Sequence, residues 1–278
     1  MSRTGQWPPV PEALPAPIVD NHCHLEYPAG DEPRSVEQRL ADAAAAGVTR
    51  VVQVGCEVES ALWTADAVAQ YPQMVGGVAI HPNEAAVLAA KGEYDDAFAT
   101  IADLARGDRI RVVSETGLDF FRTGPEGRDA QMQAFRDHIA LAKELDLPMQ
   151  IHDRDAHSEV VEVLEREGAP ERTVFHCFSG DAGLAKLAAQ RGWYLSFAGT
   201  VTFKNAGGLR AALAVTPLDH VLVETDSPFL TPHPHRGTPN HPALAALTAR
   251  TVADVLDEDL TRVCEAINST SESLYGPW

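Results

Sequence analysis

The sequence is poor in cysteine and has no long apolar run. Four cysteines are spread over 278 residues, and no two of them form a C-x-x-C pair, which argues against a disulfide framework and a zinc knuckle. No apolar run approaches the roughly 20 residues that a membrane-spanning helix needs. Residues 1–17 contain five prolines and no apolar segment of the kind found in secretory signals. We therefore expect a cytoplasmic protein with no membrane partner.

Positive charge is also scarce. The chain has 22 Lys and Arg against 40 Asp and Glu, which gives a formal net charge of -18. Proteins that coat duplex DNA neutralise many phosphates with Lys and Arg, so a partner of this class is not expected. A nuclease that holds one chain end with the help of metal ions is compatible with the charge.

Short β-rich runs alternate with helical stretches along the chain. The β-rich runs are expected at residues 18–25, 50–56, 74–80, 110–114, 148–151, 173–175, 193–197 and 221–224. Such alternation is typical of right-handed βαβ units and a parallel sheet. A count of eight favours closure into a (β/α)8 TIM barrel of the α/β class. One such domain accounts for residues 18–278, and residues 1–17 are expected to form a proline-rich lead-in.

The first of these strands ends in two histidines that are one residue apart, His22 and His24. Because alternate side chains of a strand share a face, both rings are expected to project the same way. Two imidazoles at this spacing can bind one cation, at about 2.0 to 2.1 Å per nitrogen. Asp20 lies on the same face, either as a further oxygen ligand or as a carboxylate that orients a histidine ring.

Other strand ends carry further residues that a divalent metal accepts. They are Glu115, His152, His176 and Asp226. In a parallel barrel, the carboxyl ends of the strands meet at one mouth, where active sites are built. We assign His22 and His24 to one ion, and the other two histidines to a second ion.

The two carboxylates complete this predicted centre. Glu115 is expected to bridge the ions, and Asp226 to bind the first ion and to accept a proton from the attacking water. With ions about 3.5 to 4 Å apart, a bridging water is acidified enough to be hydroxide near neutral pH. Each residue also has an ordinary alternative, such as a surface histidine, an ion pair or a helix N-cap. Their joint occurrence at successive strand ends favours the metal centre.

Several short motifs, in order along the chain, resemble the signatures of the TatD family of metal-dependent hydrolases. They are DNHCHL at 20–25, IHP at 80–82, SETGLD at 114–119, IHDRDA at 151–156, HCFSG at 176–180 and ETDSP at 224–228. The resemblance implies an amidohydrolase-type barrel, a binuclear metal site with the ligands named above, and deoxyribonuclease activity, commonly as a 3′–5′ exonuclease. It also implies that Glu115 stands where related amidohydrolases have a carboxylated lysine.

Metal and substrate follow from the resemblance and from ligand chemistry. The resemblance implies two divalent cations, with Mg²⁺ or Mn²⁺ for activity, whereas four imidazoles also suit Zn²⁺, Ni²⁺ or Co²⁺. The expected partner is the end of a DNA strand, in single-stranded form. The segment 236–242 resembles a family motif in which basic residues follow the glycine, but Thr238 and Pro239 stand there in this chain, which weakens the expected grip on the DNA backbone.

Positive residues near the strand ends are candidate contacts to a substrate phosphate. They are His81, Arg122, Arg154, Lys204 and Arg236. Solvated surface or an ion pair is the ordinary alternative for each of them. Phe120 and Phe121 are candidates for stacking on a terminal base, with core packing as the alternative.

Two other functions are compatible with the same residues. The metal centre could cleave an ester or amide, as in the removal of D-amino acids from tRNA, because the same hydroxide can attack a carbonyl. A non-catalytic scaffold that keeps a structural metal is the alternative of another class. None of the predicted ligands is missing from the sequence, which favours an enzyme.

Overall fold

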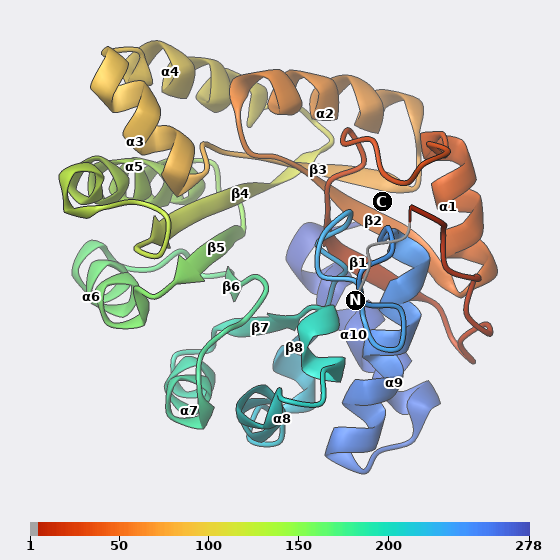
Figure 1. Ribbon diagram of the computed structural model, residues 1–278. Helices are drawn as coiled ribbons and strands as arrows, with labels where there is room; N and C mark the ends of the chain where they lie inside the picture. The colour runs from red at the N-terminus through yellow and green to blue at the C-terminus, as the bar shows by residue number, and fades with distance from the viewer. Residues whose placement is uncertain (1–4) are drawn as a thin grey trace. The chain divides into compact units, whose positions relative to one another are not determined.

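The computed structural model describes residues 5–278, in which eight strands alternate with helices (Figure 1). The strands are β1 (Ile18–Cys23), β2 (Val48–Gly55), β3 (Met74–Val78), β4 (Ile110–Asp119), β5 (Met149–Arg154), β6 (Thr173–Phe175), β7 (Tyr194–Phe197) and β8 (Val221–Val223). They form one sheet whose strand order follows the chain. Pairings such as β1 with β2, β4 with β5 and β7 with β8 are parallel. Parallel strands in chain order with helices between them are the arrangement of the (β/α)8 TIM barrel, which confirms the predicted fold class.

Ten α-helices and three short 3₁₀ helices occur in the described residues. The α-helices are α1 (Val36–Ala45), α2 (Val58–Gln70), α3 (Pro82–Lys91), α4 (Tyr94–Leu104), α5 (Pro125–Glu144), α6 (His157–Glu167), α7 (Ala182–Gln190), α8 (Gly207–Leu213), α9 (Ala245–Leu256) and α10 (Leu260–Tyr275). The 3₁₀ helices are η1 (Gly199–Thr202), η2 (Leu218–His220) and η3 (Pro242–Leu244). No helix among residues 5–278 is both long and apolar enough to cross a membrane.

The chain divides into two compact units. Unit 1 comprises Met1–Gln53 and Gly180–Trp278, and unit 2 comprises Val54–Ser179. Our assignment of residues 18–278 to a single domain stays a prediction. The four cysteines are free thiols.

Unit 1 is built on β1, whose six residues are all buried. Helix α10 packs against β1 and β8 and presents a buried apolar stripe that includes Val263, Ile267 and Leu274. Burial of side chains of this size contributes about 1.5 to 3 kcal/mol each. The inner part of β1 is thereby fixed, and its polar carboxyl end is held at a defined place.

Residues of the lead-in pack on unit 1. Trp7 donates from Nε1 to the carbonyl oxygen of Glu32 at 2.9 Å, and the Arg34 guanidinium lies 5.0 Å from the centre of the Trp7 ring. The same ring meets His241 edge-on, with 5.5 Å between ring centres. These contacts fix the lead-in against the loop that follows β1.

Unit 2 departs from the expected elements in two places. Helix α3 was not expected, although Pro82 stands at its first turn and Gly92 ends it in the left-handed conformation (φ 72°), which are ordinary helix boundaries. Strand β4 continues past Ser114 to Asp119 and pairs there with β5. The continuation needs a glycine, because a Cβ at Gly117 would lie 2.1 Å from the carbonyl oxygen of His152.

Candidate metal centre

In unit 1, the predicted ligands His22, His24 and Asp226 lie together, and we call them cluster 1. The Nε2 atoms of the two histidines are 3.2 Å apart. The Oδ1 atom of Asp226 is 3.9 Å from Nε2 of His22 and 3.5 Å from Nε2 of His24. Ligands of one tetrahedral ion, each at about 2.05 Å from it, are about 3.4 Å apart. The three donor atoms therefore fit a single divalent cation.

Cluster 1 is buried, and backbone hydrogen bonds between β1 and the residues after β8 hold it. Asp226 donates from its backbone N–H to the His22 carbonyl oxygen at 2.9 Å, and His24 donates to that of Ser227 at 2.8 Å. Asp226 adopts a left-handed conformation, with φ 52°. Such a conformation costs a non-glycine residue about 1 kcal/mol or more and is concentrated at functional sites. The fold thus fixes the direction of the aspartate side chain toward the histidines.

Asp20 contacts the residue that precedes Asp226. Its carboxylate accepts hydrogen bonds from Thr225, from the backbone N–H at 2.8 Å and from Oγ1 at 2.5 Å. Burial raises the pKa of Asp20 to about 8, against the opposing effect of these hydrogen bonds. Both oxygens are thereby engaged by Thr225, and both predicted roles of Asp20, as a ligand or as a carboxylate that orients a histidine ring, stay predictions.

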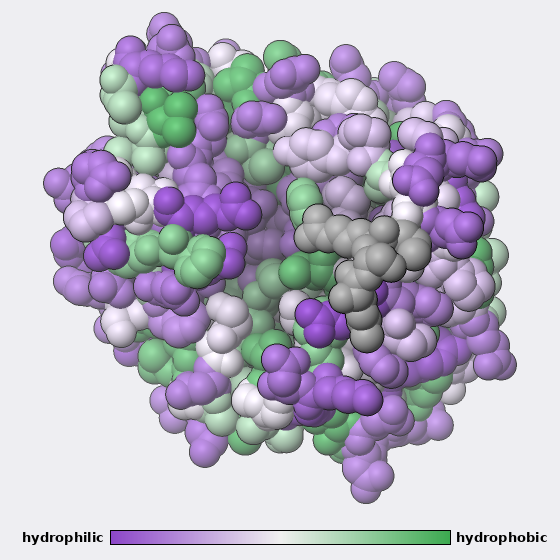
Figure 2. Space-filling model, viewed as in Figure 1, coloured by the Kyte–Doolittle hydropathy of each residue, from purple (hydrophilic) through white to green (hydrophobic). Residues whose placement is uncertain are grey.

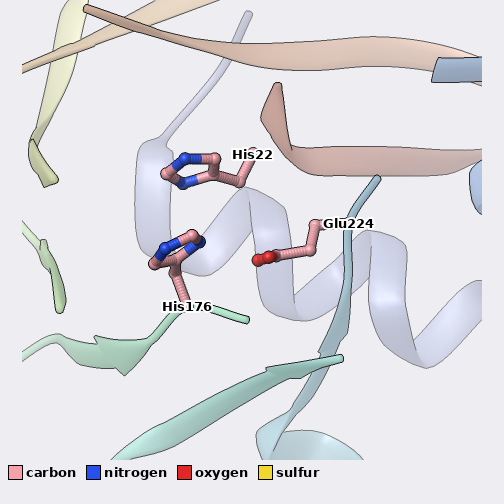
Figure 3. A group of neighbouring side chains, drawn as sticks. All are labelled: His22, His176 and Glu224. Carbon is pink, nitrogen blue, oxygen red and sulfur yellow. The ribbon is translucent and has the colours of Figure 1, made fainter. Parts of the chain in front are cut away.

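Two acids in unit 1 were not identified from the sequence. Glu26 has Oε1 at 3.7 Å from Nδ1 of His24, and its other oxygen accepts a hydrogen bond from Gln53 at 2.7 Å. A carboxylate behind a histidine ring orients the ring and raises its basicity as a metal ligand. Glu224 follows β8, is fully buried, and offers a ligand atom within 4.8 Å of a ligand atom of His22. Figure 3 draws both side chains.

In unit 2, the predicted ligands Glu115 in β4, His152 in β5 and His176 directly after β6 lie together, and we call them cluster 2. Oε2 of Glu115 is 2.8 Å from Nε2 of His176 and 3.1 Å from Nδ1 of His152. Burial raises the pKa of Glu115, but the charges of His176 and His81 and the hydrogen bonds from both ligand histidines outweigh it, so that the pKa lies well below its usual range. The carboxylate is therefore ionised, as a metal ligand must be.

Asp119 holds the far side of the His152 ring. Its Oδ2 lies 3.3 Å from Nε2 of His152 and accepts a hydrogen bond from the Asn83 side chain at 3.0 Å. Burial raises the pKa of Asp119, but the hydrogen bonds from His152, Arg122 and Asn83 lower it below its usual value. A carboxylate on Nε2 leaves Nδ1 of His152 to face Glu115 and an ion. Asp119 was not predicted as a site residue, although it ends the SETGLD motif.

His81 also lies beside cluster 2. Its ring centre is 4.5 Å from that of His152, and its Nδ1 accepts a hydrogen bond from the backbone N–H of Asn83 at 3.1 Å. Burial lowers the pKa of His81 to about 4, so the ring is neutral at neutral pH. Because Nδ1 is an acceptor, the proton is on Nε2, which leaves His81 as a hydrogen-bond donor.

The other predicted substrate contacts occupy loops. The guanidinium of Arg154 is 3.9 Å from the centre of the exposed Phe121 ring in unit 2, and that of Arg236 is 3.9 Å from the Phe203 ring in unit 1. Lys204 is exposed, and Arg122 donates its backbone N–H to Asp119 at 2.8 Å. Their contact with a substrate stays a prediction.

The donor set of the two clusters is that of a divalent metal centre. Each cluster combines two imidazoles with a carboxylate, a mixture that suits Mn²⁺, Co²⁺, Ni²⁺ or Zn²⁺ and accommodates Mg²⁺ through its oxygens. The face of the molecule in Figure 2 is largely hydrophilic, in keeping with the net charge of -18. Cations at the clusters would offset part of this charge.

Comparison with known proteins finds relatives over nearly the whole chain. The family model described as "TatD related DNase" matches residues 19–276. A Mycobacterium tuberculosis protein named "Uncharacterized metal-dependent hydrolase TatD" is 39% identical over 263 residues, which cover 93% of this chain and 98% of that protein. The uncharacterized metal-dependent hydrolase YcfH of Escherichia coli K12 is 36% identical over 251 residues, with 88% and 92% covered. The crystal structure of YjjV, a TatD homologue from E. coli, matches with a TM-score of 0.85 at 27% identity, over 94% of this chain and 98% of YjjV.

Proposed function

Because the chain belongs to the TatD family of metal-dependent hydrolases, we propose that it is a deoxyribonuclease that hydrolyses phosphodiester bonds at the ends of single-stranded DNA, as a 3′–5′ exonuclease. The observation that carries the proposal is the pair of preformed ligand clusters, in which buried imidazoles and carboxylates converge. The description of the matching family, "TatD related DNase", supports DNA as the substrate.

Two divalent cations would complete the site, one held by cluster 1 and one by cluster 2. When bound, such ions lower the pKa of a water molecule and stabilise the charge on the attacking and leaving oxygens. The bridging role of Glu115 stays a prediction from the sequence. Mg²⁺ or Mn²⁺ is proposed for activity.

The side chains supply positioning and proton transfer. Asp226 keeps 15% of its side chain exposed, whereas the side chain of His22 is fully buried, so the Asp226 carboxylate can take a proton from water and pass it to solvent. Asp119 holds His152 in the orientation in which Nδ1 faces Glu115. His81 can donate its Nε2 proton to a phosphate oxygen of the substrate, which fixes the substrate without adding a charge.

The test is a cleavage assay on purified protein. The protein is stripped with EDTA, reloaded with Mg²⁺, Mn²⁺ or Zn²⁺, and given end-labelled single-stranded DNA, with a D-aminoacyl ester assayed alongside. We expect cleavage of DNA that depends on metal and that falls about 10²- to 10⁴-fold in Asp226→Asn.

The matched control is Arg262→Ala, an exposed residue paired with Glu258 on the surface, which should cleave like wild type. If Asp226→Asn cleaves DNA as fast as wild type, a contaminant is responsible and the nuclease proposal fails. Cleavage of the ester but not of DNA would instead assign the centre to acyl transfer.

A further inference from the structure

Unit 1 contains a pocket next to cluster 1. Its volume is about 730 Å³, within the range of about 300 to 1,000 Å³ that is usual for small-ligand sites. It is lined by the loop after β1 around Asp31, by Gly5 of the lead-in, by Phe203, and by residues 228–231 and 236–239. Nothing in the proposed chemistry at the metal ions accounts for a cavity of this size.

Phe229 forms the wall of the pocket that lies nearest to cluster 1. Its side chain is 51% exposed, although its ring centre is only 6.2 Å from that of the ligand His24 and 6.1 Å from that of Tyr27. The backbone is fixed, because Phe229 donates its N–H to the Asp226 carbonyl oxygen at 2.8 Å and accepts a hydrogen bond from Asn240. An aromatic face is therefore held open beside a metal ligand, where a flat ring can stack on it.

Arg236 supplies a cation on another wall. Its guanidinium lies flat over Phe203, 3.9 Å from the ring centre, and it has no carboxylate partner among residues 5–278. The Phe203 carbonyl oxygen accepts a hydrogen bond from Arg210 at 2.7 Å, which fixes the loop that carries the ring. One face of Phe203 is thus occupied in positioning Arg236, whose N–H groups remain available to a phosphate.

We propose that this pocket binds the terminal nucleotide of a single-stranded polynucleotide, with its base stacked on Phe229 and a backbone phosphate held by Arg236. The inference rests on the proposed function and adds where the strand end lies. Among residues 5–278, one open aromatic face and one cation line the pocket, so we infer that it recognises one or two nucleotides and not a long strand. Stacking is tolerant of base identity, because every base has a π-face. The pocket therefore binds a strand end without preference for its sequence.

The test measures binding without turnover. Fluorescence anisotropy is recorded with a labelled oligothymidylate whose phosphorothioate linkages resist cleavage, on the Mn²⁺-loaded full chain. Phe229→Ala should weaken binding at least about fivefold, through loss of one stacked base. Arg236→Ala should lower the slope of log K against log salt concentration by about 0.7, the contribution of one phosphate contact in a single strand, while Phe229→Ala leaves that slope unchanged.

Two surface variants serve as matched controls. Arg262→Ala removes one positive charge from an exposed helix position, and Leu62→Ala removes an apolar side chain that is 48% exposed on α2. Both should bind the oligonucleotide like wild type. Affinities of Phe229→Ala and Arg236→Ala within twofold of wild type would overturn the inference.

A small diester separates this inference from the proposed function. Wild type is also given bis(p-nitrophenyl) phosphate, a diester with no second phosphate for Arg236 to hold, and Arg236→Ala is expected to raise the KM for DNA. If wild type cleaves neither DNA nor the diester, the proposed function fails. If wild type cleaves both and Arg236→Ala has an unchanged KM for DNA, the pocket assignment alone fails.

Discussion

The two ligand clusters differ in how closely the carboxylate approaches the histidines. In cluster 2, Glu115 has both histidines at 2.8 and 3.1 Å, and Asp119 lies behind His152, so negative and positive partners are already in contact. In cluster 1, two imidazole nitrogens face each other at 3.2 Å, and the Asp226 carboxylate is 3.5 Å or more from either of them. We therefore expect the carboxylate of cluster 2 to contribute more to the stability of the metal-free fold than the carboxylate of cluster 1.

The largest expected effect is on the stability of the metal-free protein. Glu115→Ala leaves two buried histidines without their carboxylate and should lower the free energy of unfolding by about 3 to 5 kcal/mol. Asp226→Ala removes a carboxylate that lies 3.5 Å or more from the histidines and should change the free energy of unfolding by less than about 1 kcal/mol. Urea unfolding in EDTA measures both values, and equal losses in the two variants would remove the distinction between the clusters.

With metal bound, loss of a ligand of cluster 1 should lower the free energy of unfolding by more than it does in the metal-free protein. At a concentration 100 times its dissociation constant, a bound ion adds about 2.7 kcal/mol to the free energy of unfolding. His24→Ala should bind one ion per chain instead of two and lose the part of this stabilisation that cluster 1 contributes. Metal content after dialysis, with urea unfolding at saturating Mn²⁺, measures the effect. Retention of two ions by His24→Ala would contradict the assignment of one ion to cluster 1.

Asp119 allows a finer test of cluster 2. Asp119→Asn keeps the size of the side chain but removes the charge that holds His152, and should lower metal affinity at cluster 2 about 10- to 100-fold. Asp129→Asn, at an exposed position of α5, is the control and should bind metal normally. Calorimetric titration with Mn²⁺ gives the affinities; an unchanged affinity in Asp119→Asn would mean that Asn83 and the backbone suffice to hold the loop.

Two buried histidines outside the clusters also differ in their hydrogen bonds. In unit 2, His138 accepts a hydrogen bond from the Ile80 backbone N–H at 3.0 Å and lies 2.7 Å from the Ala134 carbonyl oxygen. In unit 1, neither ring nitrogen of His241 has a hydrogen-bond partner among the described residues. At pH 7.5, His138→Phe should therefore cost about 1 to 3 kcal/mol, through the unpaired N–H that it leaves, and His241→Phe clearly less.

Lowering the pH adds a second measurement on the same pair of variants. Burial lowers the pKa of His138 from 6.5 to about 4, and burial lowers that of His241 to about 4 as well. Between pH 6.5 and about 4, the unfolded chain thus binds more protons than the folded chain. The free energy of unfolding should therefore decrease as the pH is lowered, by about 2 kcal/mol per histidine at pH 5. Each variant should lose its share of this slope in urea unfolding. If the free energy of unfolding of His138→Phe depends on pH as that of wild type does, the His138 ring of the wild-type protein is charged in the folded state.

The predictable part of the centre came from local pattern. His22 and His24 could be assigned because strand alternation fixes their common direction, and Glu115, His152 and His176 because each follows an apolar run. Asp119 could not be found in this way. It lies beyond the point where β-propensity ends, and β4 continues to it only because Gly117 lets β5 approach closely, which is a tertiary contact.

The pocket of unit 1 could not be predicted from the sequence, because it also depends on tertiary contacts. Arg236 was a candidate from its charge alone, but its stacking on Phe203 depends on a loop more than 30 residues earlier in the chain. Phe229 reads as an ordinary apolar residue after ETDSP, and only the fold shows that its ring stays exposed next to His24. Loop residues of this kind carry no periodicity, so their neighbours cannot be derived from sequence spacing.

Gly117 fixes how closely the backbone that carries Glu115 can approach the backbone that carries His152. The atom nearest to a side chain at this position would be a main-chain oxygen, which cannot swing aside as a flexible neighbour would. The separation of the two strands that carry Glu115 and His152 thus depends on the absence of a Cβ atom at residue 117. Redesign of this enzyme for other metals or substrates can vary the ligands and loops around the mouth, but it has to keep glycine at residue 117.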